Sequence, residues 1–583
     1  MLHTLTRSLR ENKGPALVTV LLSALEVVFE IVIPLFMSNL IDFGIEGGSM
    51  AAVWKFGAFL LLLAAFQLST GVLAARIAAR ASVGFAANLR EDMYNNVQTF
   101  AFSNIDKFST ASIVTRLTTD TTNVQNAFQM LMRMAIRAPV MLIFSMIVSF
   151  RISRDISMTF LIILPILALA LFFIIRSVFP VFSRVFRTYD ELNNVVQENV
   201  RGIRVVKSFN QERHEIGKFG AISERIYQDF SKGERLITLN APLMQFCIYT
   251  CMIIISWLGA KAIIASGNDP ALGLTTGNLT ALITYTMQIL SSLMMLSMVF
   301  AMLTISLSSA RRIAEVLEER SDIPQPEQPV MTVRDGAVDF DHVSFVYASK
   351  ADKKVLDDID LHIRSGETIG IIGGTGASKS SLVQLIPRLY DVTGGKLTLG
   401  GVDVRDYDLD TLRGAVAMVL QKNELFSGTI KENLRWGNEN ATDEELQHAC
   451  VLACADEFIS AMPDGYDTHI EQGGTNVSGG QKQRLCIARA LLKKPKVLIL
   501  DDSTSAVDTR TDAQIQQALS TYIPDTTKII IAQRISSVQN ADRIVVLDDG
   551  HIDAVGSHDE LLRTCEIYRE VYESQQKGGE DDA

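Results

Sequence analysis

Six long stretches in the first half of the chain are nearly free of charged side chains. Four of them contain no Asp, Glu, Lys or Arg: Phe56–Ala75, Ile156–Ile175, Leu236–Ala260 and Ala271–Ala310. Gly14–Ile41 carries only Glu26 and Glu30. Ala138–Phe150 is also apolar, and a helix beginning near Met130 extends it to full length. Because a helix needs about 20 apolar residues to cross a bilayer core ~30 Å thick, the pattern predicts six membrane-spanning helices.

The expected helices form three pairs, each closed by a short link: 14–42 with 55–76, 130–150 with 156–178, and 236–261 with 276–308. Long segments at 77–129 and 179–235 join the pairs and carry many basic residues, among them Arg76, Arg80, Arg90, Lys107, Arg116, Arg184, Arg187, Arg201, Arg204 and Lys207. Because Lys and Arg concentrate in cytoplasmic loops, we expect these segments and both termini on the cytoplasmic side of the cell membrane. Arg151 and Arg154 in a short outer link oppose this placement but are outnumbered. We expect the first apolar run to stay as a signal anchor.

The balance of charge changes near residue 330. Lys and Arg minus Asp and Glu give +4 (28 − 24) before this point and −15 (26 − 41) after it, which sums to the net charge of −11. Because the basic excess lies in the apolar half and the other half is acidic, a nucleic-acid partner is not expected. Beyond a Pro-rich junction, short apolar strands alternate with helical stretches, which is typical of an α/β unit. We therefore predict an α-helical transmembrane domain over residues 1–310, a linker over 311–336, an α/β domain over 337–575 and a polar tail over 576–583.

A phosphate-binding loop follows the expected buried strand Thr368–Ile372. The loop consists of Gly373, Gly374, Thr375, Gly376, Ala377, Ser378, Lys379, Ser380 and Ser381. Small residues let backbone N–H groups turn toward phosphates, the Lys meets the β/γ charge, and the hydroxyl after it ligates Mg²⁺. Ser378 departs from the G-x-x-x-x-G-K-[ST] pattern because Gly is usual there, and we expect its Cβ to crowd the backbone.

Further motifs complete a nucleotide site. The buried strand Val497–Asp501 ends in a carboxylate suited to holding Mg²⁺ beside phosphates. Upstream lie Tyr347, Gln421 and the pentapeptide Val477-Ser478-Gly479-Gly480-Gln481. In this order and spacing the motifs resemble the ABC transporter superfamily, specifically its half-size exporters with six membrane helices followed by one nucleotide-binding domain. The resemblance covers nearly the whole chain.

The resemblance implies an exporter-type membrane domain with long cytoplasmic extensions, followed by a P-loop ATPase domain. It also implies two halves that bind two ATP molecules between one half's phosphate loop and the other half's signature pentapeptide. Tyr347 would stack on adenine, the loop from Gly373 to Ser381 would hold phosphates, and Mg²⁺ would be bound by Ser380, Gln421 and Asp501. The signature residues Ser478, Gly479, Gly480 and Gln481 would close over the partner's nucleotide, and the dimer seam would contain Ser505, Ala506, Val507 and Asp508.

Two departures from the family pattern concern hydrolysis. Asp502 stands where the family usually has a Glu that acts as general base, and the shorter side chain withdraws the carboxylate by about an ångström, a displacement that can cost ~10²-fold in rate. Gln533 replaces the family's switch histidine and cannot carry a proton. Gln472, just before the signature, replaces a usual Glu. Drift at tolerant positions is one interpretation; the other is that this half's own site binds ATP but hydrolyses it slowly or not at all.

The intact signature and the altered site together favour a heterodimer. Asp at the base position with Gln at the switch position resembles the degenerate-site subunit of bacterial heterodimeric multidrug-type exporters. A partner half would then supply the working Glu and His. The predicted function is export of hydrophobic or amphipathic compounds. The alternatives are export of a lipid, peptide or thiol metabolite, or an ATP-gated channel or regulator that does not pump.

Coupling and cargo are less constrained. By resemblance, short coupling helices are expected at Ala111–Leu117 and Gly202–Glu212. Glu26 and Glu30 lie one turn apart in the first membrane helix and are candidates to attract a cationic substrate. Bonding of neighbouring helices or a position near the membrane interface is an equal alternative. Met287, Met294, Met298 and Met302 form a stripe on the last helix that suits a polyspecific cavity, with core packing as its commoner meaning.

Overall fold

The computed structural model describes residues 1–269, 273–347, 354–503 and 507–580, which divide into two compact units. One unit comprises Met1–Gln98 and Thr110–Glu319, and the other comprises Thr99–Ser109 and Arg320–Ala583. The short segment Thr99–Ser109 thus belongs to the second unit although the chain on both sides of it belongs to the first.

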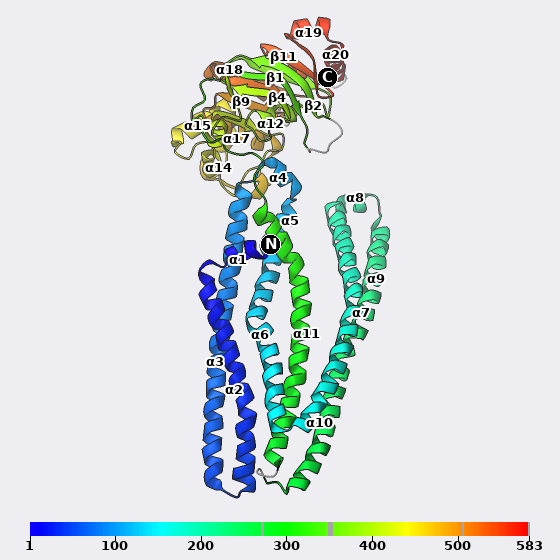
Figure 1. Cartoon of the computed structure of the whole chain (residues 1–583). Coiled ribbons are helices and arrows are strands. Elements are labelled where there is room, and N and C mark those ends of the chain that lie inside the picture. The colour runs from blue at the N-terminus through cyan, green and yellow to red at the C-terminus, as the bar shows by residue number, and fades with distance from the viewer. Residues whose placement is uncertain (270–272, 348–353, 504–506, 581–583) are drawn as a thin grey trace. The chain divides into compact units, whose positions relative to one another are not determined.

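The first unit is helical (Figure 1). Within the described residues, six helical stretches are long and apolar enough to cross a membrane, which confirms the predicted number: Arg10–Glu46, Met50–Gln98, Thr110–Ile152, Arg154–Arg201, Glu212–Ser266 and Thr276–Glu318. The long helices within them are α2 (Lys13–Asn39), α3 (Met50–Gln98), α6 (Thr121–Ile152), α7 (Arg154–Arg201), α9 (Glu212–Thr238), α10 (Asn240–Ser266) and α11 (Thr276–Glu318). Shorter helices are α1 (Leu2–Arg7), α5 (Thr110–Thr115) and α8 (Ile203–Ser208), with π-helical turns at Leu40–Glu46 and Arg116–Asp120.

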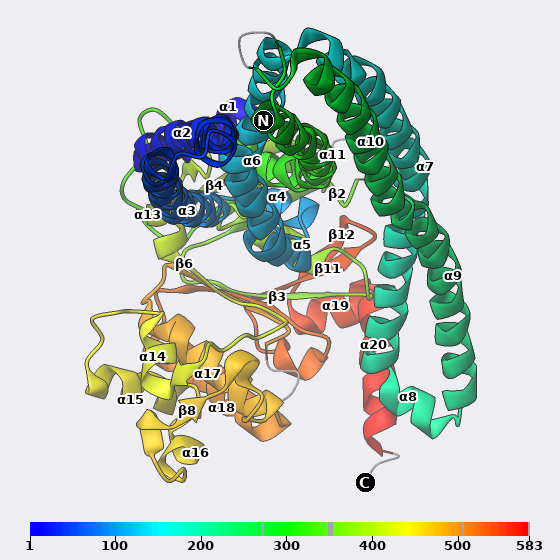
Figure 2. The same ribbon diagram turned by 90° about the horizontal axis from the view of Figure 1, so that it is seen from below.

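These helices form two groups. Helix α2 packs on α3 and α6, and α11 packs chiefly on α6. Helix α7 runs beside α9 and α10, and α10 also packs on α11 (Figure 2). Toward α8, helices α7 and α9 diverge from the first group (Figure 1). Helix α11 continues without a break to Glu318, beyond the predicted end of the transmembrane domain at residue 310.

Within the residues that the structure describes, the second unit contains three sheets. The strand orders are β2-β1-β4-β5, β12-β11-β3-β10-β9-β6 and β7-β8. The strands are β1 (Val338–Phe345), β2 (Leu356–Ile363), β3 (Thr368–Gly373), β4 (Gly394–Leu399), β5 (Val402–Asp403), β6 (Val416–Val419), β7 (Gly428–Thr429), β8 (His469–Ile470), β9 (Val497–Asp501), β10 (Thr527–Ile531), β11 (Arg543–Asp548) and β12 (His551–Gly556). The helices are α4 (Phe102–Lys107), α12 (Lys379–Leu385), α13 (Leu409–Ala415), α14 (Ile430–Arg435), α15 (Asp443–Leu452), α16 (Asp456–Ser460), α17 (Gly479–Leu492), α18 (Thr509–Tyr522), α19 (His558–Thr564) and α20 (Glu566–Glu580).

The six-stranded sheet separates two hydrophobic cores. All five residues of β9 are buried, and they alternate: Leu498 and Leu500 join the core shared with α14, α15 and α17, whereas Val497 and Ile499 join the core shared with β1, β2 and α12. The sequences of parallel strands that are covered on both faces are continuous apolar runs. This explains why both predicted buried strands are found, with the first extended by one residue to Gly373.

One expectation about the cytoplasmic extensions is corrected. Residues 111–117 do not form a helix of the second unit but continue as α5 and a π-helical turn in the helical unit, where Arg116 pairs with Glu315 of α11 at 3.0 Å. Helix α4 instead belongs to the second unit, where Asn104 donates a hydrogen bond to the carbonyl of Arg320 at 2.9 Å. A short helix, α8, does form within the second predicted segment.

Candidate functional site

The predicted nucleotide residues gather at one edge of the six-stranded sheet. Strand β10 is parallel to both β3 and β9, and Ile531 at its end pairs with Ile371 on one side and Asp501 on the other. Strand β6 is parallel to β9 as well. Because the carboxyl ends of parallel strands meet at the same edge, the residues that follow β3, β6, β9 and β10 converge there.

The phosphate loop turns sharply between β3 and α12. A Cβ on Gly373 would lie 2.1 Å from the carbonyl oxygen of Leu547, so only glycine fits at the start of the loop. Gly376 has a φ of +88°, the left-handed region that glycine adopts at little cost. Ser378 has a φ of 68° and therefore holds a left-handed conformation with a side chain attached. The expected disturbance at Ser378 is thus backbone strain within the loop.

Lys379 begins α12 and reaches back across the loop. Its Nζ donates to the carbonyl oxygens of Gly373 and Gly374, both at 2.8 Å. Burial lowers the pKa of Lys379, and the nearby carboxylates of Asp501 and Asp502 partly counter that effect. An anionic phosphate at this position would relieve the buried charge, as expected for a phosphate-binding lysine.

Asp501 ends β9 beside the loop and is 3 % exposed. Burial raises the pKa of this carboxyl, while a hydrogen bond from Ser380 opposes the rise. Ser380, Gln421 and Asp501 line one cavity and offer a hydroxyl, an amide oxygen and a carboxylate. Oxygen donors of this kind suit Mg²⁺, so the residues present fit the ion that the sequence predicts.

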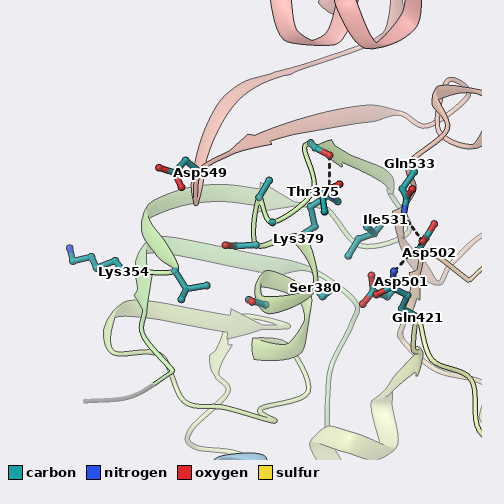
Figure 3. Close-up of a pocket in the computed structure, with 16 residues that line it drawn as sticks. Lys354, Thr375, Lys379, Ser380, Gln421, Asp501, Asp502, Ile531, Gln533 and Asp549 are labelled. Carbon is teal, nitrogen blue, oxygen red and sulfur yellow. Dashed lines mark hydrogen bonds between the residues drawn. The ribbon is translucent and has the colours of Figure 1, made fainter. Parts of the chain in front are cut away.

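Asp502 lies between two glutamines. Its Oδ2 accepts a hydrogen bond from Nε2 of Gln533 at 2.8 Å and a longer one from Nε2 of Gln421 at 3.4 Å. Its backbone is also constrained, since φ is 47° and its N–H donates to the carbonyl of Ile531 at 2.9 Å. The three side chains form a connected amide and carboxylate cluster, visible on one side of Figure 3.

These groups surround a cavity of about 550 Å³. Its lining includes the predicted residues Gly373, Thr375, Gly376, Ala377, Ser378, Lys379, Ser380, Ser381, Gln421, Asp501, Asp502 and Gln533. Sequence reasoning missed Lys354, Val355, Ile531 and Asp549, which also line it. Lys354 and Asp549 lie away from the amide and carboxylate cluster (Figure 3). Ile531 ends a strand parallel to β9 and was therefore within reach of sequence reasoning. Asp549 lies in the turn between β11 and β12, where Asp549-Gly550 predicts a hairpin but no contact with a nucleotide.

Several predicted residues lie outside the described lining of this cavity. Tyr347 donates or accepts a 2.7 Å hydrogen bond with the hydroxyl of Ser381, and its ring stands edge-on to other aromatic rings. Asp508 caps α18 by accepting a hydrogen bond from the N–H of Thr511 at 2.9 Å. The neighbouring Ser505 and Ala506 are outside the described residues.

The signature pentapeptide forms the start of α17. The hydroxyl of Ser478 accepts from the N–H of Gln481 at 3.2 Å, and the side chain of Gln481 accepts from the N–H of Ser478 at 2.9 Å. Such a reciprocal capping box fixes the first turn of a helix. Gly479 and Gly480 occupy that first turn, and Ser478 and Gly479 are exposed. The pentapeptide therefore presents a preformed helix start to the surface of its unit.

The two intramembrane carboxylates have a partner. Arg137 of α6 donates to Glu26 at 2.8 Å and to Glu30 at 2.7 Å. The carbonyl of Glu30 also accepts from Gln288 of α11 at 3.2 Å. Of the meanings that the sequence left open, bonding of neighbouring helices is thus present. The methionines Met287, Met294 and Met298 are 43 %, 41 % and 60 % exposed on α11.

Comparisons with known proteins agree over the whole chain. A family model described as the ABC transporter transmembrane region matches residues 16–294, and one described as ABC transporter matches residues 356–505. The uncharacterized ABC transporter ATP-binding protein YfiB of Bacillus subtilis is 35 % identical over 96 % of this chain and 96 % of its own length. An uncharacterized ABC transporter ATP-binding protein of Mycobacterium tuberculosis is 33 % identical over 99 % of this chain and 98 % of its own.

A solved structure, described as a bacterial Atm1-family ABC exporter with ATP bound, has the same fold. The TM-score is 0.79 with 24 % identity, and the match covers 97 % of this chain and 98 % of that one.

Proposed function

Because this chain belongs to the ABC transporter family, as a multi-pass half transporter with one ATPase domain, we propose that it is the degenerate-site subunit of a heterodimeric exporter. In this proposal its own site binds Mg²⁺ and ATP but hydrolyses ATP weakly, and its signature pentapeptide completes the working site of a different half. The cargo is a hydrophobic or amphipathic compound, drug-like or lipid-like, exported across the cytoplasmic membrane with both chain termini on the cytoplasmic side.

The observation that carries the proposal is the contact between Gln533 and Asp502. A general base must accept a proton from the attacking water, and a switch residue that can carry a proton helps to stabilise the product state. Here the carboxylate at the base position is short, and one of its oxygens accepts an amide N–H at 2.8 Å. Such an arrangement supports retention of ATP in this half's site rather than turnover.

The need for a second subunit is supported by the placement of the signature. The described lining of the nucleotide cavity contains none of Ser478, Gly479, Gly480 or Gln481. The phosphate loop lines only one side of the site, and in this proposal a signature pentapeptide closes the other side. One ATPase domain alone therefore does not form the complete site. The preformed, exposed start of α17 suits the role of closing the site of another chain.

Exposed apolar residues in the helical unit also support the presence of a second subunit. A groove of about 340 Å³ between α7, α8 and α9 is lined mainly by Val195, Val196, Val200, Ile203, Val206, Ile216 and Phe219. Val200 and Ile216 are 67 % and 69 % exposed. Large exposed apolar patches on polar helices mark sites of contact with other chains.

The choice of cargo rests on the methionines of α11. Flexible thioethers adapt to ligands of different shape, and Met294 and Met298 are exposed within their unit. The ion pairs of Arg137 leave Glu26 and Glu30 as weaker candidates for binding a cation, because a single guanidinium already neutralises one of their two charges.

The test is steady-state ATP hydrolysis in lipid nanodiscs, with this chain co-expressed with a candidate partner half. Asp502→Ala should change turnover of the pair by less than about threefold, whereas substitution of the partner's base should nearly abolish it. Gly480→Asp should also be severe because it obstructs the helix start that closes over the partner's nucleotide. Equal losses from the two base substitutions would contradict the proposal.

A further inference from the structure

Residues 532–537, which follow β10, bring Gln533 to the nucleotide cavity, and we call them the switch segment. Gln533 lines the cavity, and its side chain donates to Asp502 at 2.8 Å. The start of the segment is bonded to the sheet, because the N–H of Ala532 donates to the carbonyl of Ile371 at 3.3 Å. From Gln533 onward the course of the segment depends on contacts with helices outside the sheet.

Helix α20 contacts this segment through one side chain. Gln575 donates from Nε2 to the carbonyl oxygen of Gln533 at 2.8 Å, and its Oε1 accepts from the N–H of Ile535 at 2.9 Å. Ile535 is 1 % exposed, so its position is fixed by packing as well. The two bonds use the donor and the acceptor of a single amide group. Gln575 therefore fixes the direction of the backbone between Gln533 and Ile535.

Helix α20 itself is anchored one and two turns before Gln575. Tyr568 is fully buried in the core shared with α14, α15 and α17, and Val571 and Tyr572 pack against the same core. The hydroxyl of Tyr568 also shares a 2.7 Å hydrogen bond with Nδ1 of His558 in α19. Because the preceding turns of α20 are held by this packing, the place of the Gln575 amide is set by the tertiary structure.

The far end of the switch segment is held by α18. The hydroxyl of Ser537 donates to Asp512 at 2.6 Å, and the side chain of Gln516 donates to the carbonyl of Ser537 at 2.6 Å. These contacts meet the segment four residues after Gln533, whereas Gln575 meets it at Gln533 itself. Loss of the Gln575 amide should therefore displace Gln533 while the far end of the segment stays in place.

We propose that Gln575 is a positioning residue for the ATP site of this half: it holds the backbone of Gln533 so that the Gln533 amide faces the γ-phosphate of a bound nucleotide. The proposal rests on the proposed function because it needs ATP in this cavity. It deepens that function by giving α20 a share in distinguishing ATP from ADP.

The place of Gln533 explains why it distinguishes the two nucleotides. Asp502 stands at the position of the base that faces the attacking water, so Gln533 beside it lies at the γ-phosphate end of the cavity. The Gln533 amide carries two hydrogens, and one of them is donated to Asp502. The other can be donated to a phosphate oxygen, and bonds to charged acceptors are stronger than neutral ones. ADP has no phosphate at this end.

The experiment measures the Kd values of AMP-PNP and ADP, each with Mg²⁺, for the full chain in lipid nanodiscs. Gln575→Met keeps the length of the side chain and its preference for helix but removes both hydrogen bonds. It should weaken AMP-PNP binding by about fivefold, the fold-change that corresponds to one hydrogen bond. The Kd for ADP should change by less than about twofold. A general loss of structure would instead weaken the binding of both nucleotides.

Gln576→Met is the matched control. Gln576 is the next residue of α20, and its described hydrogen bond goes to the hydroxyl of Tyr572 at 2.6 Å rather than to the switch segment. Both Kd values should stay unchanged in this variant. Gln575→Glu keeps an acceptor for the N–H of Ile535 but places a carboxylate against the carbonyl of Gln533. It should therefore weaken AMP-PNP binding at least as much as Gln575→Met.

A double variant tests whether Gln575 acts through Gln533. Gln533→Ala removes the positioned amide, so adding Gln575→Met to it should weaken AMP-PNP binding no further. Additive losses would overturn the positioning role. So would an equal loss of ADP binding in Gln575→Met, an unchanged Kd for AMP-PNP in that variant, or an equal loss in Gln576→Met.

Failure of this inference is separable from failure of the proposed function. AMP-PNP is not hydrolysed, so its binding does not depend on whether Asp502 and Gln533 support turnover. Robust hydrolysis at this site together with a selective loss in Gln575→Met would contradict the degenerate-site proposal and leave the positioning role intact. Weak hydrolysis with no selective loss would do the reverse.

Discussion

At the residue scale, Ser378 departs from the phosphate-loop pattern, and the effect of this departure is confined to the backbone of the loop. It adopts a φ of 68° where the motif pattern has Gly, and a side chain in this region costs about 1 kcal/mol. Ser378→Gly should therefore stabilise the nucleotide-free protein by up to about 1 kcal/mol. Glycine also raises the conformational entropy of the unfolded chain, and this effect reduces the gain. Thermal unfolding without nucleotide measures this difference.

A control for Ser378→Gly lies one residue away. Ala377 shares the loop but does not have a positive φ, so Ala377→Gly should lower stability through backbone entropy and the loss of a buried methyl group. A loss of stability in Ser378→Gly equal to that in Ala377→Gly would contradict the strain described for this loop.

At the element scale, the ion pairs of Arg137 join α2 to α6. These side chains are partly buried, so removing one partner leaves uncompensated charge at a cost below the ~3–5 kcal/mol of a fully buried pair. Arg137→Met should accordingly lower the melting temperature of the detergent-solubilised protein strongly. Adding Glu26→Gln and Glu30→Gln to the same chain should restore most of the loss, because no buried charge then remains unpaired.

Arg133→Met, about one turn earlier on α6, is the matched control for this prediction. It removes a cation of the same kind outside the two ion pairs to Glu26 and Glu30. Its melting temperature should stay near that of the unmodified protein. If the triple variant were no more stable than Arg137→Met, the pairs would not be what holds these helices together.

Helices and strands could be predicted from the sequence where their residues are uniformly apolar. The six membrane stretches and strands β3 and β9 are continuous apolar runs, so burial on all sides selects their structure without knowledge of their neighbours. Helix α4 was not predicted, because Phe102–Lys107 is mixed in character and its helix is fixed by distant partners. Asn104 donates to the carbonyl of Arg320, and Asp106 accepts from Tyr390. No local sequence pattern predicts either contact.

At the scale of the whole molecule, the candidate site was predictable to the extent that motifs carry it. Lys379, Ser380 and Asp501 follow strand ends that sequence patterns reveal, and all three line one cavity. Their roles toward nucleotide and Mg²⁺ stay a prediction. The hydrogen bonds of Asp502 with Gln533 and Gln421 were not predictable, because they depend on the order β3-β10-β9-β6 in the sheet. That order brings a residue after β10 against a residue after β9.

We propose that Asp502 and Gln533 are the residues that weaken ATP hydrolysis in this half. Two copies of this chain would bring two intact signatures to two altered sites, so replacing only the altered residues should complete both sites. The most direct measurement is ATP hydrolysis of the chain purified alone in nanodiscs, unmodified and as Asp502→Glu with Gln533→His. We predict near-background turnover for the unmodified chain and a rise of at least about tenfold in the double variant. Robust hydrolysis by the unmodified chain would contradict the account.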